Sequence, residues 1–159
     1  MQILGLDYGR ARIGLAIADS ESVLARPLDT FERINRNEDM RRLRELVRAN
    51  GVKLLVVGLP LRLDGTRGEM ADEAARFAER LRKQIGLPVE MVDERLTSWE
   101  AERLLEERGG RVVRKSRNST NKKRGRAEGK NTSHAMAAAV ILKDYLEQKH
   151  AAKHLNFKT

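Results

Sequence analysis

The sequence predicts a single α/β domain built on a mixed five-stranded sheet with helices on its faces. Three extended segments joined by short turns come first, and they predict an antiparallel meander. Helical and extended segments alternate after them, which predicts parallel strands joined by crossover helices. The length of 159 residues is typical of one domain and is sufficient to bury a hydrophobic core.

The meander is predicted by the first 33 residues. Gln2–Tyr8 is largely apolar, as a buried central strand would be. Gly9 and Arg10 then turn the chain, and Ile13–Asp19 alternates branched apolar residues with small ones. Ala25–Arg33 is the third extended segment. Short turns between neighbouring strands indicate antiparallel pairing.

The middle of the chain changes to a helical period. Apolar residues from Asn37 onward fall on one helical face, and Asn50-Gly51 predicts the end of this helix. The apolar run Lys53–Gly58 predicts a buried strand that Pro60 closes.

The remaining elements follow the same alternation. We expect a helix over Gly68–Gly86, a strand over Pro88–Asp93, a helix over Ser98–Arg108 and a last helix over Thr132–Gln148. These limits predict one domain over residues 1–150, with a basic loop at 111–131, and a polar tail at 151–159. No internal repeat and no second domain is visible.

The composition excludes several classes of protein. Cysteine is absent, so disulfide scaffolds, cysteine nucleophiles and thiolate metal sites are excluded. The longest uncharged apolar runs, Leu54–Leu61 and Ala135–Leu142, are far shorter than the roughly 20 residues of a membrane span. No secretory signal is visible at the N-terminus. We expect a soluble, cytoplasmic protein with no membrane partner.

The positive charge is concentrated in one segment. The chain carries a net charge of +9, and Arg114–Lys130 contains eight bases and a single acid. Such a run favours a polyanionic partner, although an inert solvated loop is the alternative. Aromatic residues are only 4% of the chain, so recognition of backbone and shape is favoured over stacking on bases.

Two acidic residues interrupt apolar strands at their ends. Asp7 follows the apolar part of the first strand, and Asp93-Glu94 closes the fifth. Both should lie at the carboxyl edge of the parallel half of the sheet, where α/β proteins bind ligands. Paired carboxylates suit Mg²⁺ or Mn²⁺, which can assist phosphodiester hydrolysis. The alternative is that each acid caps a turn or pairs with Arg10, Arg12 or Arg95.

Four sequence blocks stand out along the chain. These are GLDYGRARIGLAIAD (5–19), VVGLPLRLDGT (56–66), DERLTSWEAERLL (93–105) and AAAVILKDYLEQ (137–148). In this order they resemble the YqgF/RuvX family of resolvase-like nucleases. The resemblance implies an RNase H-like fold and a nuclease that processes the 5′ end of precursor 16S ribosomal RNA. It also implies that Asp7 and Glu94 are metal ligands and that the Gly58–Gly65 segment approaches the nucleic-acid backbone.

The third acid of the family pattern is replaced in this sequence. Counting back from Leu142 places His134 at that position. We predict that Asp7, Glu94 and His134 are the catalytic and metal-binding residues, and that nitrogen ligation by His134 favours Mn²⁺ over Mg²⁺. A structural role for this lone histidine is the alternative. The predicted nucleic-acid-binding residues are all basic: Arg10, Arg12, Arg62, Arg114, Lys115, Arg117, Lys122, Lys123, Arg124, Arg126 and Lys130.

Three functions stay open from the sequence. The first is a metal-dependent nuclease of structured RNA, with precursor ribosomal RNA or a ribosomal particle as its partner. The second is a junction resolvase acting on branched DNA, and such enzymes work as dimers. The sequence thus leaves both a monomer and a homodimer open. The third is a non-catalytic RNA-binding module in which His134 marks a lost site. A phosphotransferase of the actin-like superfamily ranks below these, because 159 residues cannot supply its two domains.

Overall fold

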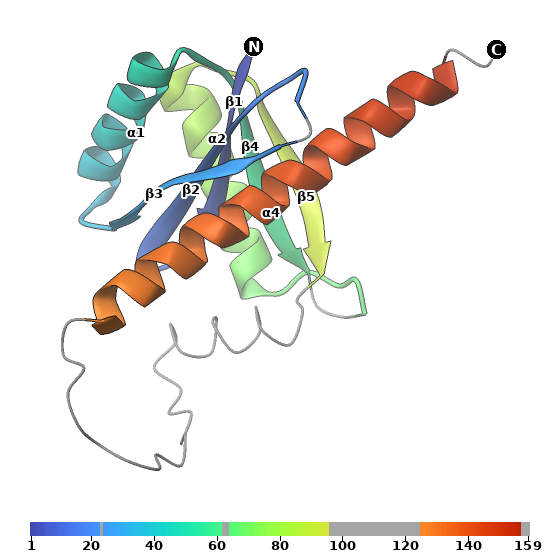
Figure 1. Cartoon of the computed structure of the whole chain (residues 1–159). Helices are drawn as coiled ribbons and strands as arrows, with labels where there is room; N and C mark the ends of the chain where they lie inside the picture. The colour runs from blue at the N-terminus through green and yellow to red at the C-terminus, as the bar shows by residue number, and fades with distance from the viewer. Residues whose placement is uncertain (23, 62–63, 96–124, 157–159) are drawn as a thin grey trace.

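The computed structural model describes residues 1–22, 24–61, 64–95 and 125–156, with their side chains except those of residues 95, 125–132 and 156. It contains five strands and three helices in these ranges (Figure 1). In chain order they are β1 (Gln2–Tyr8), β2 (Arg12–Asp19), β3 (Arg26–Glu32), α1 (Arg36–Asn50), β4 (Val52–Leu61), α2 (Glu69–Ile85), β5 (Val89–Arg95) and α4 (Gly125–Asn156).

The strands form one mixed sheet in the order β3-β2-β1-β4-β5. Strand β2 pairs antiparallel with β1 and with β3, whereas β4 runs parallel to β1 and to β5. The predicted meander and parallel half are therefore confirmed. This mixed sheet with helices on its faces is the RNase H-like fold that the resemblance implies.

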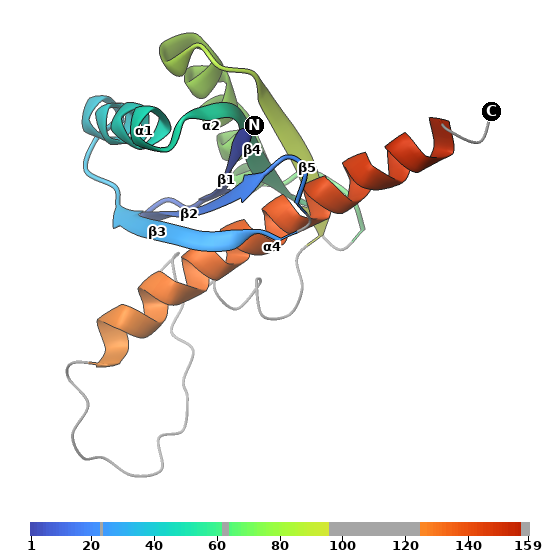
Figure 2. The same ribbon diagram turned by 45° about the horizontal axis from the view of Figure 1, so that its top comes forward.

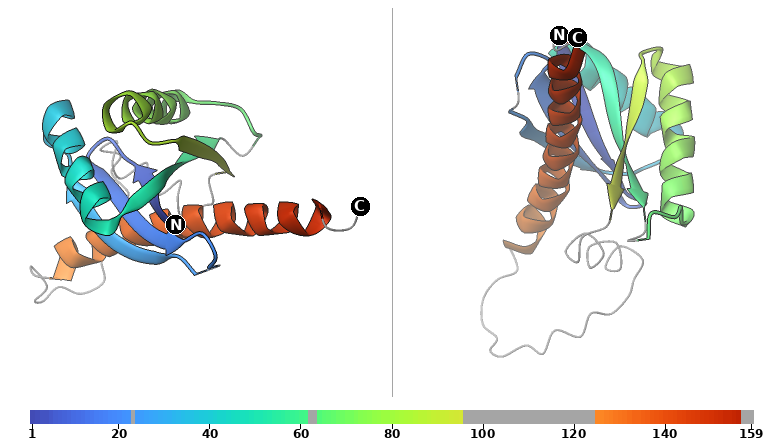
Figure 3. Two further views of the ribbon diagram at one scale, coloured as in Figure 1. Left: turned by 90° about the horizontal axis from the view of Figure 1, so that it is seen from above. Right: turned by 90° about the vertical axis from the view of Figure 1, so that its right-hand side faces the viewer.

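Helices cover both faces of the sheet, as Figures 2 and 3 show. Helices α1 and α2 cover one face, where Leu4, Leu6 and Phe77 belong to a buried apolar cluster. Helix α4 crosses the other face and forms a second cluster that includes Val56 and Leu142. Fully burying one such side chain contributes about 1.5–3 kcal/mol, so the two clusters hold the three layers together.

Local capping interactions and glycines determine the ends of α1 and α2. The side chain of Asn35 accepts a hydrogen bond of 2.8 Å from the Glu38 backbone N–H and so caps α1. Helix α1 ends at Gly51 and α2 at Gly86, both with positive φ values of 62° and 77°. Only glycine adopts that backbone conformation without strain, which explains why these helices stop there.

The predicted limits of two elements, β4 and α4, are wrong. Strand β4 continues through Pro60 to Leu61, and Pro60 pairs with Glu94 of β5. The pairing of β4 with β1 ends at Val57, so Pro60 has a strand on one side only and its missing N–H is tolerated.

Helix α4 is longer at both ends than the predicted Thr132–Gln148. It begins at Gly125, inside the expected basic loop, and continues to Asn156, inside the expected polar tail. The residues that follow Gln148 include alanine and lysine, which favour helix over coil, and neither glycine nor proline interrupts them. The predicted helix at Ser98–Arg108 lies outside the described residues. No helix in the described ranges is long and apolar enough to cross a membrane.

Candidate active site

Asp7 lies at the carboxyl end of β1 and faces α4. Side chains alternate along a strand, and Leu4, Leu6 and Tyr8 belong to the cluster under α1 and α2, whereas Ile3 packs against α4. Asp7 shares the face of Ile3. Its side chain is buried, with the residue only 7% exposed. A carboxylate in such a place needs a compensating partner, because burial disfavours its charge.

His134 of α4 lies beside this carboxylate. The distance between His134 Nδ1 and Asp7 Oδ2 is 3.5 Å, and His134 is 3% exposed. The sequence resemblance placed His134 at the position of an acid in the site, and the structure brings it next to Asp7.

Gly14 of β2 allows His134 to lie close to Asp7. Gly14 is the residue of β2 that pairs with Asp7 of β1. A Cβ atom at Gly14 would lie 2.1 Å from the backbone oxygen of His134, which no side chain can accept. The α4 backbone therefore crosses the sheet in direct contact with Gly14, and His134 lies over the Asp7–Gly14 pair. Gly14 was not among the predicted site residues. The available signal was a glycine inside an apolar strand, which often marks a close approach of another backbone.

Glu94 lies at the same edge of the sheet and on the same face. Val92 of β5 packs against α4, and Glu94 is two residues further along, so it faces the same side. Glu94 pairs with Pro60, three residues beyond Val57, which pairs with Leu6 of β1. One strand, β4, thus separates Glu94 from the Asp7–His134 pair.

The donor atoms of this site are of the kinds that bind divalent cations. Two ligands bound to one ion at about 2.0–2.2 Å can lie up to about 4 Å apart, and the 3.5 Å between Asp7 Oδ2 and His134 Nδ1 falls within that limit. Oxygen and nitrogen donors suit Mg²⁺, Mn²⁺ and related ions. Within the described residues no three Asp, Glu, His or Cys side chains already gather closely enough to enclose a metal ion. Asp7 and His134 therefore fit as two ligands, and Glu94 is the carboxylate that could move to complete the set.

The two described arginines of the predicted nucleic-acid interface are engaged in ion pairs. Arg10 contacts Glu73, with an Nη2–Oε1 distance of 2.7 Å, and Glu69 at 3.4 Å. The hydrogen bond to Glu73 raises the pKa of Arg10 above its usual value. Arg12 contacts Glu32 at 3.4 Å. Both cations therefore already have protein carboxylates as partners, and a nucleic acid would compete with them.

The other predicted interface residues lie outside the described residues or have only their backbone described. Outside the described residues lie Arg62, Arg114, Lys115, Arg117, Lys122, Lys123 and Arg124. Arg126 and Lys130 belong to the first turns of α4, and only their backbone is described. Their roles stay predictions.

Known proteins and a family model match this chain over almost its whole length. The family model RuvX, described as Holliday junction resolvase, matches residues 1–148. A protein of Anaeromyxobacter sp. (strain Fw109-5), named "Putative pre-16S rRNA nuclease", is 44% identical over 151 residues, which are 95% of this chain and 100% of that protein. A protein of Koribacter versatilis (strain Ellin345) with the same name is 40% identical and covers 93% of this chain and 88% of its own length. Among solved structures, RuvC of T. thermophilus in complex with Holliday junction substrate aligns with a TM-score of 0.49 at 15% identity, over 95% of this chain and 96% of that one.

Proposed function

Because the chain belongs to the RuvX family of resolvase-like nucleases, we propose that it is a divalent-metal-dependent nuclease that processes the 5′ end of precursor 16S ribosomal RNA. The observation that carries this proposal is the 3.5 Å contact between Asp7 and His134 at the carboxyl edge of the sheet. A buried carboxylate beside an imidazole on the ligand-binding edge of an α/β sheet is typical of a metal or catalytic site and costs stability otherwise.

Each residue of the site has a proposed role. Asp7 and Glu94 supply oxygen ligands to a divalent cation, and His134 supplies a nitrogen from the opposite layer. When bound, the cation would stabilise the charge that develops on the phosphate and activate water. The protein contributes fixed geometry: Asp7 is held by the β1–β2 ladder, and His134 is held by the contact of α4 with Gly14. Asp7 can also accept a hydrogen bond from the attacking water and so orient it.

The proposed metal is Mn²⁺ in preference to Mg²⁺. An imidazole in place of a carboxylate removes one negative charge from the ligand set, and Mg²⁺ depends most on hard oxygen ligands. Mn²⁺ accepts nitrogen ligands more readily.

The proposed substrate is structured RNA, with a ribosomal precursor particle as the partner. The names of the curated relatives support RNA. The description of the matching family model supports a second candidate, resolution of branched DNA by a homodimer. The concentrated positive charge of residues 114–130 supports either nucleic acid, because contacts to phosphates do not distinguish the two.

A side-by-side cleavage assay tests the proposal. The purified protein is incubated with a transcript that spans the 5′ end of 16S ribosomal RNA and its leader, and separately with a four-way DNA junction, each with Mg²⁺ or Mn²⁺. We expect cleavage of the transcript near the mature 5′ end with Mn²⁺, and slower cleavage or none of the junction. Faster cleavage of the junction would replace the first candidate with the second.

Two variants connect this activity with the site. Asp7→Asn and Glu94→Gln each remove a charged metal ligand. We expect a loss of the cleavage rate of at least about a hundredfold, because removal of even an outer-shell partner of a metal ligand costs about 10–100-fold in metal affinity or activity. The matched control is Asp72→Asn, which removes an exposed carboxylate of α2 and should leave the rate unchanged. If either site variant cleaves as fast as the wild type while its melting temperature is unchanged, the assignment of that residue is wrong. If no variant and no metal gives cleavage although RNA binds, the non-catalytic module becomes the better description.

A further inference from the structure

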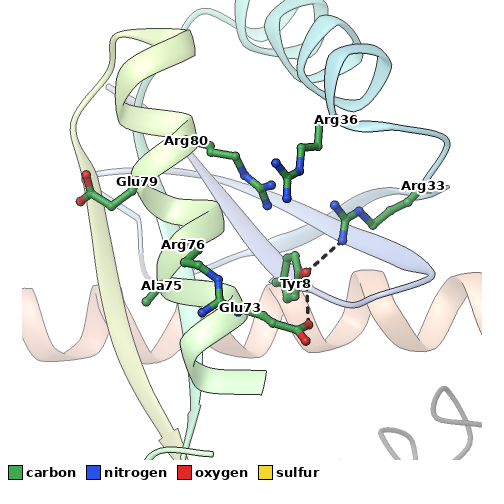
Figure 4. A pocket seen from close by; sticks show the side chains of 8 residues that line it. All are labelled: Tyr8, Arg33, Arg36, Glu73, Ala75, Arg76, Glu79 and Arg80. Carbon is green, nitrogen blue, oxygen red and sulfur yellow. Dashed lines mark hydrogen bonds between the residues drawn. The ribbon is translucent and has the colours of Figure 1, made fainter. Parts of the chain in front are cut away.

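A second site lies on the opposite face of the sheet from Asp7 and His134. It is a cavity of about 720 Å³ between α2, the start of α1 and the end of β1, and its lining includes the side chain of Tyr8 (Figure 4). Tyr8 follows Asp7 on β1 and faces the α1 and α2 side, so the sheet separates the cavity from the candidate active site. A volume of this size accommodates a small ligand such as a nucleotide.

Arginines from three parts of the chain line this cavity. Arg33 comes from the segment after β3, Arg36 is the first residue of α1, and Arg76 and Arg80 are one turn apart on α2. Figure 4 shows the guanidinium groups of Arg36 and Arg80 directed into the same space. Positive charges are brought together here by tertiary structure, because Arg33 and Arg36 are more than 35 residues away from the other two in the sequence.

The two acidic residues of the lining form their ion pairs with arginines outside this group, although the charge of Glu73 also attracts Arg76. Glu73 binds Arg10 at 2.7 Å and accepts a hydrogen bond of 3.4 Å from the hydroxyl of Tyr8. Glu79 is paired with Arg82, and Figure 4 shows it directed away from the cavity. Both carboxylates thus have cationic partners outside the group of four arginines.

Three of the four arginines have no carboxylate partner in the described part of the chain. Arg33 is held by Asp39 at 3.2 Å and donates a hydrogen bond of 3.0 Å to the Tyr8 hydroxyl. Arg36, Arg76 and Arg80 form no ion pair with any described residue, and the Nε of Arg80 is buried without a hydrogen-bond partner among them. Burial, together with the positive charges of Arg36, Arg33 and Arg76, lowers the pKa of Arg80 below its usual value. A buried guanidinium N–H without a hydrogen-bond partner and like charges close to one another both cost free energy, and an anionic ligand would reduce both costs.

We propose that this cavity is a phosphate-binding site. Guanidinium groups bind phosphate oxygens through paired, charge-assisted hydrogen bonds, and four of them around one space match the several oxygens of a phosphate group. Arg33 is already oriented by the buried carboxylate of Asp39, so it needs little reorganisation to bind. The phosphate comes either from a small phosphomonoester, such as a nucleotide, or from the backbone of a nucleic acid that reaches this face.

The proposal does not depend on the nuclease activity. Binding here uses residues that lie across the sheet from the candidate active site and that are absent from the predicted nucleic-acid interface. Loss of cleavage in Asp7→Asn would therefore leave phosphate binding intact, and loss of phosphate binding would leave the roles of Asp7 and His134 unaffected.

The test uses the full-length protein and two charge-matched double variants. Arg36→Gln with Arg76→Gln removes one exposed cation of the cavity from each of α1 and α2. Arg48→Gln with Lys83→Gln removes one exposed cation from each of the same helices outside the cavity and serves as the control. The probes are inorganic phosphate, AMP and a short RNA duplex, and binding is followed by calorimetry and by the Nε–H signals of ¹⁵N-labelled arginine.

We expect phosphate and AMP to shift an arginine Nε–H signal that disappears in Arg80→Lys. The cavity variant should weaken this binding by at least about tenfold, since two charge-assisted contacts are lost, whereas the control variant should change it less than about twofold. If the cavity variant also weakens binding of the duplex and phosphate competes with the duplex, the natural ligand is a nucleic-acid backbone; if duplex binding is unchanged, the ligand is a small phosphomonoester. The proposal is overturned if phosphate shifts no arginine signal up to about 20 mM, a concentration far above that expected for four charge-assisted contacts, or if both double variants weaken binding equally.

Discussion

At the scale of single residues, His134 distinguishes this chain from the carboxylate pattern that its sequence otherwise resembles. The replacement changes the charge next to Asp7. At 3.5 Å from its carboxylate lies an imidazole ring and not a second carboxylate. In the absence of metal this arrangement avoids repulsion between two buried acids. The same change reduces the attraction of the site for a hard dication.

Exchange of His134 for aspartate tests this argument. We expect His134→Asp to raise the ratio of the Mg²⁺-supported to the Mn²⁺-supported cleavage rate by roughly tenfold, and His134→Ala to lose most of the rate with both metals. The variant with two buried carboxylates should also melt at a lower temperature without metal and recover when Mg²⁺ is added, because a cation that binds the folded state stabilises it. The control is His150→Ala, on the same helix but hydrogen-bonded to Ser20 O at 3.3 Å, away from the site. Wild-type rates in His134→Ala would show that this histidine is structural.

The ion pair between Arg10 and Glu73 makes a prediction about stability and pH. The hydrogen bond from Arg10 lowers the pKa of Glu73 below its usual value of 4.5. A carboxylate with a lowered pKa in the folded state stabilises the protein above its unfolded pKa, and this contribution is lost as the pH falls through the folded pKa. We expect Glu73→Gln to lower the free energy of unfolding at pH 7 by about 0.5–1 kcal/mol.

Urea denaturation at pH 7 and at several values below pH 4.5 measures this effect. The difference between wild type and Glu73→Gln should shrink as the pH is lowered, because the wild-type carboxylate then becomes protonated. Glu147→Gln is the control, since Glu147 is exposed and lies 3.9 Å from Lys143. A difference that stays constant down to the lowest pH would mean that packing of the side chain, and not its charge, stabilises the fold.

At the scale of elements, the glycines under α4 determine where the helix crosses the sheet. A Cβ atom at Gly14 would meet the backbone of His134 at 2.1 Å, whereas one at Gly58 would meet the end of the Ile141 side chain at 2.5 Å. Backbone cannot move without displacing the helix, but an isoleucine can change its rotamer. We expect Gly14→Ala to destabilise the protein by about 3 kcal/mol or more and Gly58→Ala by about 1 kcal/mol, measured by chemical denaturation.

The same pair of variants separates fold from site. Gly14→Ala should also reduce cleavage more than its stability loss explains, because it moves His134 away from Asp7. Gly58→Ala leaves the Asp7–Gly14 contact with α4 in place, so its effect on the position of His134 should be smaller than that of Gly14→Ala. Equal destabilisation by the two substitutions would contradict this prediction, because it would show that the backbone of α4 moves away as easily as the Ile141 side chain does.

The sequence was informative for most elements because their signals are local. Period-2 and period-3.6 apolar patterns predicted the five strands and the first two helices, and Gly51 and Gly86 predicted helix ends. The limits of α4 were not predicted, because a serine-, asparagine- and glycine-rich segment indicates a loop, while its last residues, from Gly125, belong to a helix. Local composition cannot decide between these outcomes when packing of a long helix on the sheet contributes as well.

The site was predictable in part for the same reason. Asp7 and Glu94 stand out as charges at the ends of apolar strands, and the structure puts both on the α4 face. The contact of Asp7 with His134 depends on the path of α4 over Gly14, which no local pattern contains. The arginine cavity could not be predicted at all, because it assembles residues from the segment after β3, from α1 and from α2 that are related only by the tertiary fold.

At the scale of the whole molecule, the sheet separates two different chemical environments. The α4 face carries a buried carboxylate and imidazole at the edge of the parallel strands, which suits a metal. The α1 and α2 face carries a group of arginines, which suits phosphate. Asp7 and Tyr8 are neighbours on β1, and Asp7 faces α4 whereas Tyr8 faces α1 and α2. A phosphate bound near Tyr8 would therefore lie beside the residue that follows the candidate catalytic carboxylate in the strand.

At the same scale, most of the net charge of the molecule lies in a short part of its sequence. Residues 114–130 hold eight bases and one acid in a chain whose net charge is +9. We expect replacement of Lys122, Lys123, Arg124 and Arg126 by glutamine to weaken binding of precursor RNA. Each phosphate contact contributes roughly 0.7–0.9 to the slope of log K against log salt, so the slope should flatten by up to roughly 3–4. The control replaces Arg44, Arg48, Lys53 and Lys83, which removes the same total charge from other parts of the chain and should flatten the slope much less. Measurement of RNA affinity at several salt concentrations distinguishes the two: equal slopes in both variants would mean that net charge alone attracts RNA, whereas a change confined to the first would mean that this segment contacts the phosphates directly.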